Sequence, residues 1–153
     1  MDGPDQHDRL YQEFRWLLPE DFNIAQWCCR RWSDDPQRVA MYVDDETDGD
    51  RIVPYAELQN DADRLSNVLR SLGITRGARV AMVLPQRAEV AVAHVACQQI
   101  GAIATLMSVM FGPEALEYRL QDSEAEVIIV DRAALPALDS VRRLCKTLRH
   151  AIA

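Results

Sequence analysis

The chain of 153 residues has very little lysine, since Lys146 is the only one. It lacks both glycine-rich phosphate-binding motifs, GxGxxG and GxxxxGK(S/T), and it lacks the GxSxG elbow of serine hydrolases. No apolar run approaches the roughly 20 residues that a membrane helix needs. These absences exclude most lysine chemistry and argue against a P-loop enzyme, a dinucleotide-binding reductase, a serine hydrolase and a membrane span.

Metal-binding patterns are missing as well. The four cysteines, Cys28, Cys29, Cys97 and Cys145, show no CxxC or Cys/His spacing, so we expect reduced thiols and no zinc site. The acidic run at residues 44–50 could bind a divalent cation, but it lacks the spacing of a calcium loop. We interpret that run as a solvated turn between two strands.

The formal net charge of the chain is −7, and the excess negative charge lies near the start. An acidic protein without a basic stripe argues against nucleic acid as a partner. Residues 1–10 are polar and acidic, unlike a signal peptide. We therefore expect a cytoplasmic protein that acts without a nucleic-acid partner.

The second half of the chain alternates between strand and helix patterns. Predicted strands lie at residues 79–84, 102–106, 126–130 and 148–152, and predicted helices lie at residues 88–100 and 113–122, with two short pieces within 133–146. Strands that are apolar on both faces are typical of a mainly parallel sheet covered by helices. The predicted fold class is therefore a three-layer α/β domain.

The first half is predicted to contain two helices and a hairpin. Residues 11–18 form a short helix or a strap lying on the domain, and residues 24–32 form a helix capped by Asn23. Residues 38–43 and 51–53 pair across the acidic turn. A longer amphipathic helix follows and stops at Gly73. Its predicted buried stripe consists of Leu58, Ala62, Leu65, Leu69 and Leu72.

Two groups of polar side chains are candidates for chemistry, and each has a plainer interpretation. His94 lies in an apolar helix, where it could act as a base or ligand, or simply occupy the core with one hydrogen-bond partner. Glu57 and Asp61 form an i, i+4 carboxylate pair that could do acid–base work. The plainer interpretation is a solvated helix face with Arg64 nearby. His7 and His150 lie near the termini and carry little signal.

Two further groups are candidates for binding. The turn between Gly73 and Gly77 could bind an anion through Arg76 and Arg79, or it could be a plain connection between helix and strand. Separately, the apolar side chains after the second predicted strand could line a pocket or pack in the core. These are Met107, Met110 and Phe111. No catalytic, cofactor-binding or metal-binding residue is assigned from the sequence.

An ordered series of short motifs runs through most of the chain. The motifs are Val-Pro-Tyr-Ala-Glu-Leu at 53–58, Leu-Gly at 72–73, Gly-Ala-Arg-Val-Ala at 77–81, Leu-Pro at 84–85, Gly-Ala at 101–102, Phe-Gly-Pro-Glu-Ala-Leu-Glu-Tyr-Arg-Leu at 111–120 and Asp-Ser at 122–123. This series resembles the N-terminal subdomain of AMP-forming acyl-CoA synthetases, which are adenylate-forming ligases. The likeness is to their acetyl-CoA and medium-chain branches and covers about residues 22–153.

The chain departs from the family pattern at two positions. The family has Thr or Ser where Pro54 stands, so the reciprocal hydrogen bonds of a capping box with Glu57 cannot form. The missing cap is expected to cost about 1 kcal/mol. The family often has a proline near Leu106, so the turn after that strand and any pocket wall beside it are expected to differ.

The resemblance implies a two-step reaction in which a carboxylic acid and ATP give an acyl-adenylate and pyrophosphate, and CoA then gives the thioester. It implies ATP, magnesium and CoA for the full-length enzyme and no cofactor for this chain alone. We expect residues 1–22 to form a strap and residues 23–153 a partial AMP-binding domain that stops before the phosphate-binding loop. Such a chain is a scaffold, inactive alone, that needs a complementing C-terminal polypeptide. The alternative is a non-catalytic binding or interaction module derived from that scaffold.

Overall fold

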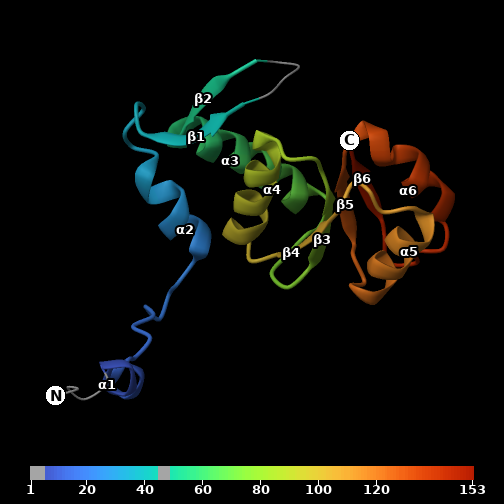
Figure 1. Cartoon of the computed structure of the whole chain (residues 1–153). Coiled ribbons are helices and arrows are strands. Elements are labelled where there is room, and N and C mark those ends of the chain that lie inside the picture. The colour runs from blue at the N-terminus through green and yellow to red at the C-terminus, as the bar shows by residue number, and fades with distance from the viewer. Residues whose placement is uncertain (1–5, 45–48) are drawn as a thin grey trace.

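The computed structural model describes residues 6–44 and 49–153, and Figure 1 shows how its elements are arranged. Their order is α1 (Gln6–Glu13), α2 (Ile24–Cys28), η1 (Arg30–Trp32), β1 (Val39–Val43), β2 (Arg51–Pro54), α3 (Tyr55–Ser71), β3 (Arg79–Val83), α4 (Ala88–Gln99), β4 (Ile103–Met107), α5 (Pro113–Asp122), β5 (Val127–Val130), η2 (Arg132–Ala134), α6 (Leu135–Val141) and β6 (His150–Ile152). The acidic run at residues 44–50 lies partly outside the described residues.

A parallel sheet with the strand order β4-β3-β5-β6 forms the centre of the domain. Alternate residues of β3 enter different cores: Val80 and Met82 face one layer, whereas Ala81 and Val83 face the other. Helices α3 and α4 cover the first face, and α5 and α6 cover the second (Figure 1). The predicted three-layer α/β fold is therefore confirmed.

The hairpin of β1 and β2 is a separate two-stranded antiparallel sheet beside α3, as its pairing pattern predicted. Its register shifts between Val39 and Met41. The buried Val53 of β2 joins the core formed by α3 and α4. The hairpin therefore extends one layer of the domain without joining the central sheet.

The segment before residue 19 differs from the prediction for residues 11–18. Helix α1 begins and ends earlier, and no residue of it is buried. The large apolar side chains that follow are exposed, Trp16 to 79% and Leu17 to 92%. Figure 1 shows α1 standing away from the layered domain, because its side chains have no apolar surface to pack against.

The single helix predicted over residues 24–32 is divided in two. The Asn23 side chain caps α2 as expected, accepting hydrogen bonds from the backbone N–H groups of Ala25 and Gln26. Cys29 then departs from helical geometry, with φ −130° and ψ −68°, and a 3₁₀ turn follows. The buried Cys29 thiol packs into the core at this break, so tertiary packing has overridden the local helical pattern.

Helix α3 behaves as its sequence predicts at both ends. Pro54 provides no side-chain cap, which confirms the loss of the capping box. At the other end Gly73 adopts φ +82°, the N–H of Gly73 donates to the carbonyl of Arg70, and the N–H of Ile74 donates to that of Leu69. This is a Schellman ending, which requires a left-handed residue at that position.

Helix α4 ends in the same way at Gly101, where a side chain would be doubly unfavourable. The residue has φ +73°, and a β-carbon built on it would lie 3.1 Å from Cγ of Arg76. We expect Gly101→Ala to lower the free energy of unfolding by about 1–2 kcal/mol, because an L residue is strained in this conformation. Urea denaturation measures the change. Gly112→Ala is the matched control, since nothing lies within 4 Å of that position, and equal losses in the two variants would contradict the expectation.

Candidate functional site

The strand order reverses between β3 and β5. From β3 the chain crosses through α4 to β4 on one side, whereas β5 and β6 lie on the other side of β3. In open parallel sheets ligands bind beyond the carboxyl ends of the strands at such a reversal. The backbone N–H of Asp131 donates to the carbonyl of Val83 at 2.8 Å, which holds the ends of these two strands together.

A hollow of about 480 Å³ lies at this edge of the sheet. It is lined by Leu84, Arg87, Glu89, Val130, Asp131, Arg132 and Ala153. Its volume is within the range of small-ligand sites, roughly 300–1,000 Å³. The lining combines an apolar floor from the strand ends with two arginines and two carboxylates, so it is suited to a polar ligand with separated charges.

Local structure fixes the charged groups of this hollow. The Asp131 carboxylate accepts a hydrogen bond from the backbone N–H of Ala133 and so caps the turn η2. Arg87 immediately precedes α4 and lies 3.5 Å from the carboxylate of Glu89. The first turn of α4 adds the positive end of a helix dipole, which favours an anion. Arg132 is exposed at the rim.

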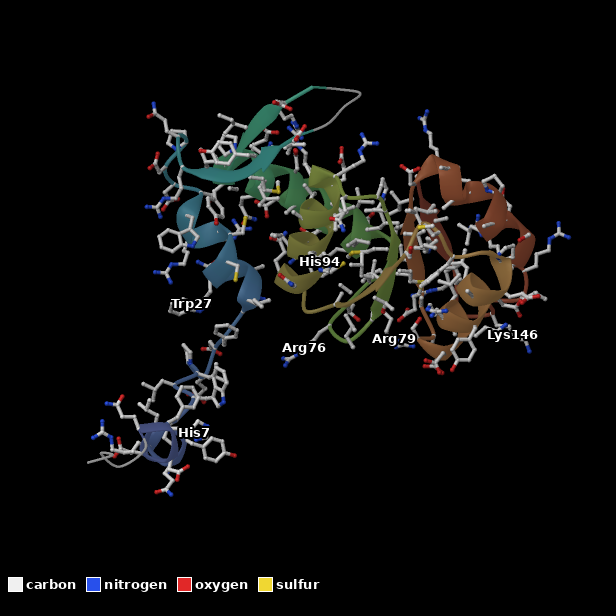
Figure 2. All side chains as sticks on the ribbon, viewed as in Figure 1. His7, Trp27, Arg76, Arg79, His94 and Lys146 are labelled. Carbon is white, nitrogen blue, oxygen red and sulfur yellow. The ribbon has the colours of Figure 1, made fainter. Side chains whose placement is uncertain are left out.

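The proposed anion site at the turn before β3 does not form. Arg79 is engaged by the α5–β5 connection, because its guanidinium donates to the carbonyls of Ser123 and Glu124 and to the Glu124 carboxylate at 2.9 Å. Arg76 instead lies against Gly101. Figure 2 shows Arg76 and Arg79 at the end of the sheet where β3 begins. The plain-turn interpretation is therefore correct.

Lys146 and His94 are not among the residues that line the hollow. Lys146 is exposed in the turn between α6 and β6. His94 is half-buried on α4 and has no hydrogen-bond partner among the described residues. The expectation of a core histidine with one partner is therefore wrong, because this position of α4 is only half-buried.

The carboxylate pair on α3 is a solvated face, as the plainer interpretation held. Glu57 pairs with Arg51 at 3.0 Å, and Asp61 pairs with Arg64 at 3.6 Å. The two acids therefore have separate cationic partners on the surface. They form no shared site for proton transfer.

Two of the three apolar side chains after β4 pack in the core, which is one of the two interpretations that the sequence allowed. Met107 is buried beneath α5, and Phe111 packs against the same core cluster. The outer side of the Phe111 ring lies under the guanidinium of Arg119, 4.0 Å from its centroid. Met110, in contrast, is 88% exposed and does not contribute to this core.

The cysteines match the prediction of free thiols: Cys28 is exposed, and the other three are buried. Burial raises the pKa of Cys29 to about 11 and that of Cys97 to about 12, and it also raises the pKa of Cys145. These buried thiols are protonated at neutral pH and are poor nucleophiles. Within residues 6–44 and 49–153, no three His, Cys, Asp or Glu side chains gather to hold a metal ion.

The fold and the hollow together define a three-layer α/β domain with a hollow at the switch point of a parallel sheet, where such folds bind ligands. Residues 28–152 match the AMP-binding enzyme family, and the chain therefore belongs to that family. The resemblance drawn from the ordered motifs is confirmed.

Several relatives and solved structures agree with this assignment. An acetyl-coenzyme A synthetase from Halorhodospira halophila is 38% identical over 119 residues, which is 76% of this chain and 18% of the relative. An acyl-CoA synthetase structure from Brucella canis superposes with a TM-score of 0.83 at 25% identity and covers 96% of this chain and 28% of its own. An anthranilate CoA ligase in complex with anthranoyl-AMP has a TM-score of 0.75 at 27% identity, over 88% of this chain and 25% of its own. The chain thus spans roughly a fifth to a quarter of the length of these proteins.

The residues that the structure describes do not fit the magnesium ion expected in this family. They form no cluster of hard oxygen ligands, and the sequence has no Ser/Thr/Gly-rich phosphate loop. A search of the described residues for a helix long and apolar enough to cross a membrane finds none.

Proposed function

We propose that this chain forms the opening part of the adenylation domain of an AMP-forming acyl-CoA synthetase. In that reaction a carboxylate attacks the α-phosphate of ATP to give an acyl-adenylate and pyrophosphate, and the CoA thiol then displaces AMP. The observation that carries the proposal is the match of residues 28–152 to the AMP-binding enzyme family. The likeness to solved acyl-CoA ligases supports it.

Within such an enzyme the chain contributes scaffold and supplies no catalytic groups. Its one lysine lies in an exposed turn. Glu57 and Asp61 pair with surface arginines, and Asp131 caps a turn. We therefore assign no catalytic or metal-binding residue to it. Because α1 stands away from the layered domain (Figure 1), we further propose that residues 1–22 act as a strap on a surface supplied by the rest of the enzyme. Residues 23–153 would form the part of the domain before the phosphate-binding loop. A cytoplasmic location remains a prediction.

We propose that the residues lining the hollow at the carboxyl edge of the sheet form one wall of the substrate cleft. Arg87 and Arg132 lie there beside the first turn of α4, where an anionic group is favoured. Phosphate-bearing substrates such as ATP and CoA supply that charge. Their remaining contacts, and those of the carboxylic acid, would come from a complementing C-terminal polypeptide.

Complementation tests the proposal. The chain is mixed with an acetyl-CoA synthetase relative that lacks the segment this chain matches, and ATP–pyrophosphate exchange is measured. We expect neither polypeptide to exchange alone and the mixture to exchange well above either one. Arg132→Ala is expected to lower the exchange rate of the mixture at least about tenfold, since hydrogen bonds to charged groups contribute about 1.5–3 kcal/mol. Arg143→Ala, an exposed arginine outside the hollow, is the matched control.

A non-catalytic module built on the same scaffold predicts a different result. The chain would melt cooperatively and associate with the truncated relative, but the mixture would show no exchange. That outcome, with the intact relative active under the same conditions, would overturn the proposal. If Arg132→Ala and Arg143→Ala lowered the exchange rate equally, the proposed role of the hollow in substrate binding would be wrong, but the proposed enzyme class would stand.

A further inference from the structure

A second hollow, of about 430 Å³, lies between the α2–η1 segment and helices α3 and α4, away from the carboxyl edge of the sheet. Every residue that lines it is polar: Asn23, Gln26, Arg30, Asp63, Ser66, Asn67, Arg70 and Gln99. We infer that this hollow binds a small oxyanion, a phosphate or carboxylate group. Neither the membership in the AMP-binding enzyme family nor the proposed function assigns it a ligand.

The base of this hollow is a rigid polar network. The Oδ1 atom of Asp63 accepts hydrogen bonds from Arg30 at 2.5 Å, Gln59 at 3.0 Å and Gln99 at 3.1 Å. The Gln99 amide also donates to the hydroxyl of Ser66, which is only 1% exposed. Because these groups are joined by several hydrogen bonds, the base holds its shape and Asp63 is already neutralised by Arg30. One buried atom of the network, Oε1 of Gln59, has no hydrogen-bond partner in the described part of the chain.

The rim, in contrast, carries donors without partners. The Arg70 guanidinium makes no hydrogen bond or ion pair with any residue in the described part of the chain, and neither do the side-chain amides of Gln26 and Asn67. Long helical side chains lean toward the N-terminus of their helix, so Arg70 reaches back over Asn67 toward the hollow. Three unpaired donor groups therefore converge on one opening.

The charge of the lining selects the class of ligand. Two guanidinium groups face one carboxylate, so the lining has a positive net charge although the whole chain has a net charge of −7. A cation would be repelled, and an apolar group would leave the Arg70 guanidinium and the rim amides of Gln26 and Asn67 unpaired. A compact oxyanion can instead accept hydrogen bonds from the Arg70 fork and the amides together.

Titration of the chain with inorganic phosphate and with sodium acetate, followed by backbone amide NMR, tests the inference. Sodium chloride holds the ionic strength constant, because exposed charges are screened by salt. We expect saturable shifts in residues 26–30 and 63–70. Phosphate saturating alone assigns the site to phosphoryl groups, and saturation by both probes assigns it to oxyanions in general.

Variants of α3 distinguish specific phosphate binding in the hollow from nonspecific attraction of phosphate to surface arginines. Arg70→Gln is expected to weaken phosphate binding at least about tenfold, and Arg70→Lys by less, since lysine keeps the charge but loses the fork. Arg64→Gln is the control, because Arg64 is an exposed arginine on the same helix, paired with Asp61 outside the hollow. Shifts that fail to saturate with either probe, or equal losses in the two glutamine variants, would overturn the inference.

Discussion

Ile128→Ala is expected to lower the free energy of unfolding by about 3–4 kcal/mol, the usual cost of a large cavity in a core. Ile128 is fully buried on β5, between β3 and β6, and faces the layer formed by α5 and α6. Its neighbours belong to two strands and two helices, so the space left by the lost methyl groups cannot collapse. For a chain of this length the loss corresponds to a fall in Tm of about 10 °C.

Ile103→Ala provides the matched control for this prediction. Ile103 lies in the same sheet but on its edge strand β4, and its side chain is 52% exposed. Its truncation is expected to cost less than about 1 kcal/mol, because little apolar surface leaves a packed environment. Guanidinium denaturation of both variants measures the difference. A comparable loss at the two positions would show that the sheet is not packed as described.

Asp63→Ala is expected to cost about 2–3 kcal/mol, because it removes the shared acceptor of three side chains. The amides of Gln59 and Gln99 would lose a partner inside the protein, and Arg30 would lose its carboxylate. Leaving buried donors unsatisfied costs about 1–3 kcal/mol for each group, and part of that cost is relieved here by water at the hollow. The free energy of unfolding in urea measures the effect.

Asp61→Ala is the control that distinguishes the loss of the hydrogen-bond network from the loss of an ordinary surface ion pair. Asp61 lies on the same helix and pairs only with the exposed Arg64 at 3.6 Å, so its loss is expected to cost less than about 0.5 kcal/mol. A second comparison uses amide hydrogen exchange of α2. Asp63→Ala should increase exchange in α2, because the network fastens η1 to α3. Unchanged exchange together with equal stability losses would mean that the network contributes nothing beyond a surface ion pair.

The Gln59–Asp63–Gln99 network could not be predicted from the sequence. The helical pattern placed Leu58, Ala62 and Leu69 on the buried face correctly. Gln59 and Ser66 are also buried, at 4% and 1% exposure, although their side chains are polar. Both bond to Gln99 of α4, and Arg30 of η1 joins the network through Asp63. Periodicity within one helix carries no information about which polar groups a neighbouring helix supplies.

The carboxyl-edge hollow was missed for a related reason. Its residues follow two strands that the sequence did predict, those containing Val83 and Val130. One signal was present in the pattern, because a parallel sheet was expected and ligands bind beyond the carboxyl ends of its strands. The order β4-β3-β5-β6 was needed to show that β3 and β5 are neighbours and that Arg87 and Arg132 therefore line one hollow.

The sequence by itself determined the local elements and the family. Apolar periodicity, the glycine that ends α3 and the proline that replaces its cap are short-range features, and each acts within a few residues of the chain. Tertiary structure alone decided the break at Cys29, the half-burial of His94, the separation of Arg76 from Arg79 and the strand order. Those outcomes depend on packing between segments far apart in sequence, where the burial of one side chain is settled by its neighbours in space.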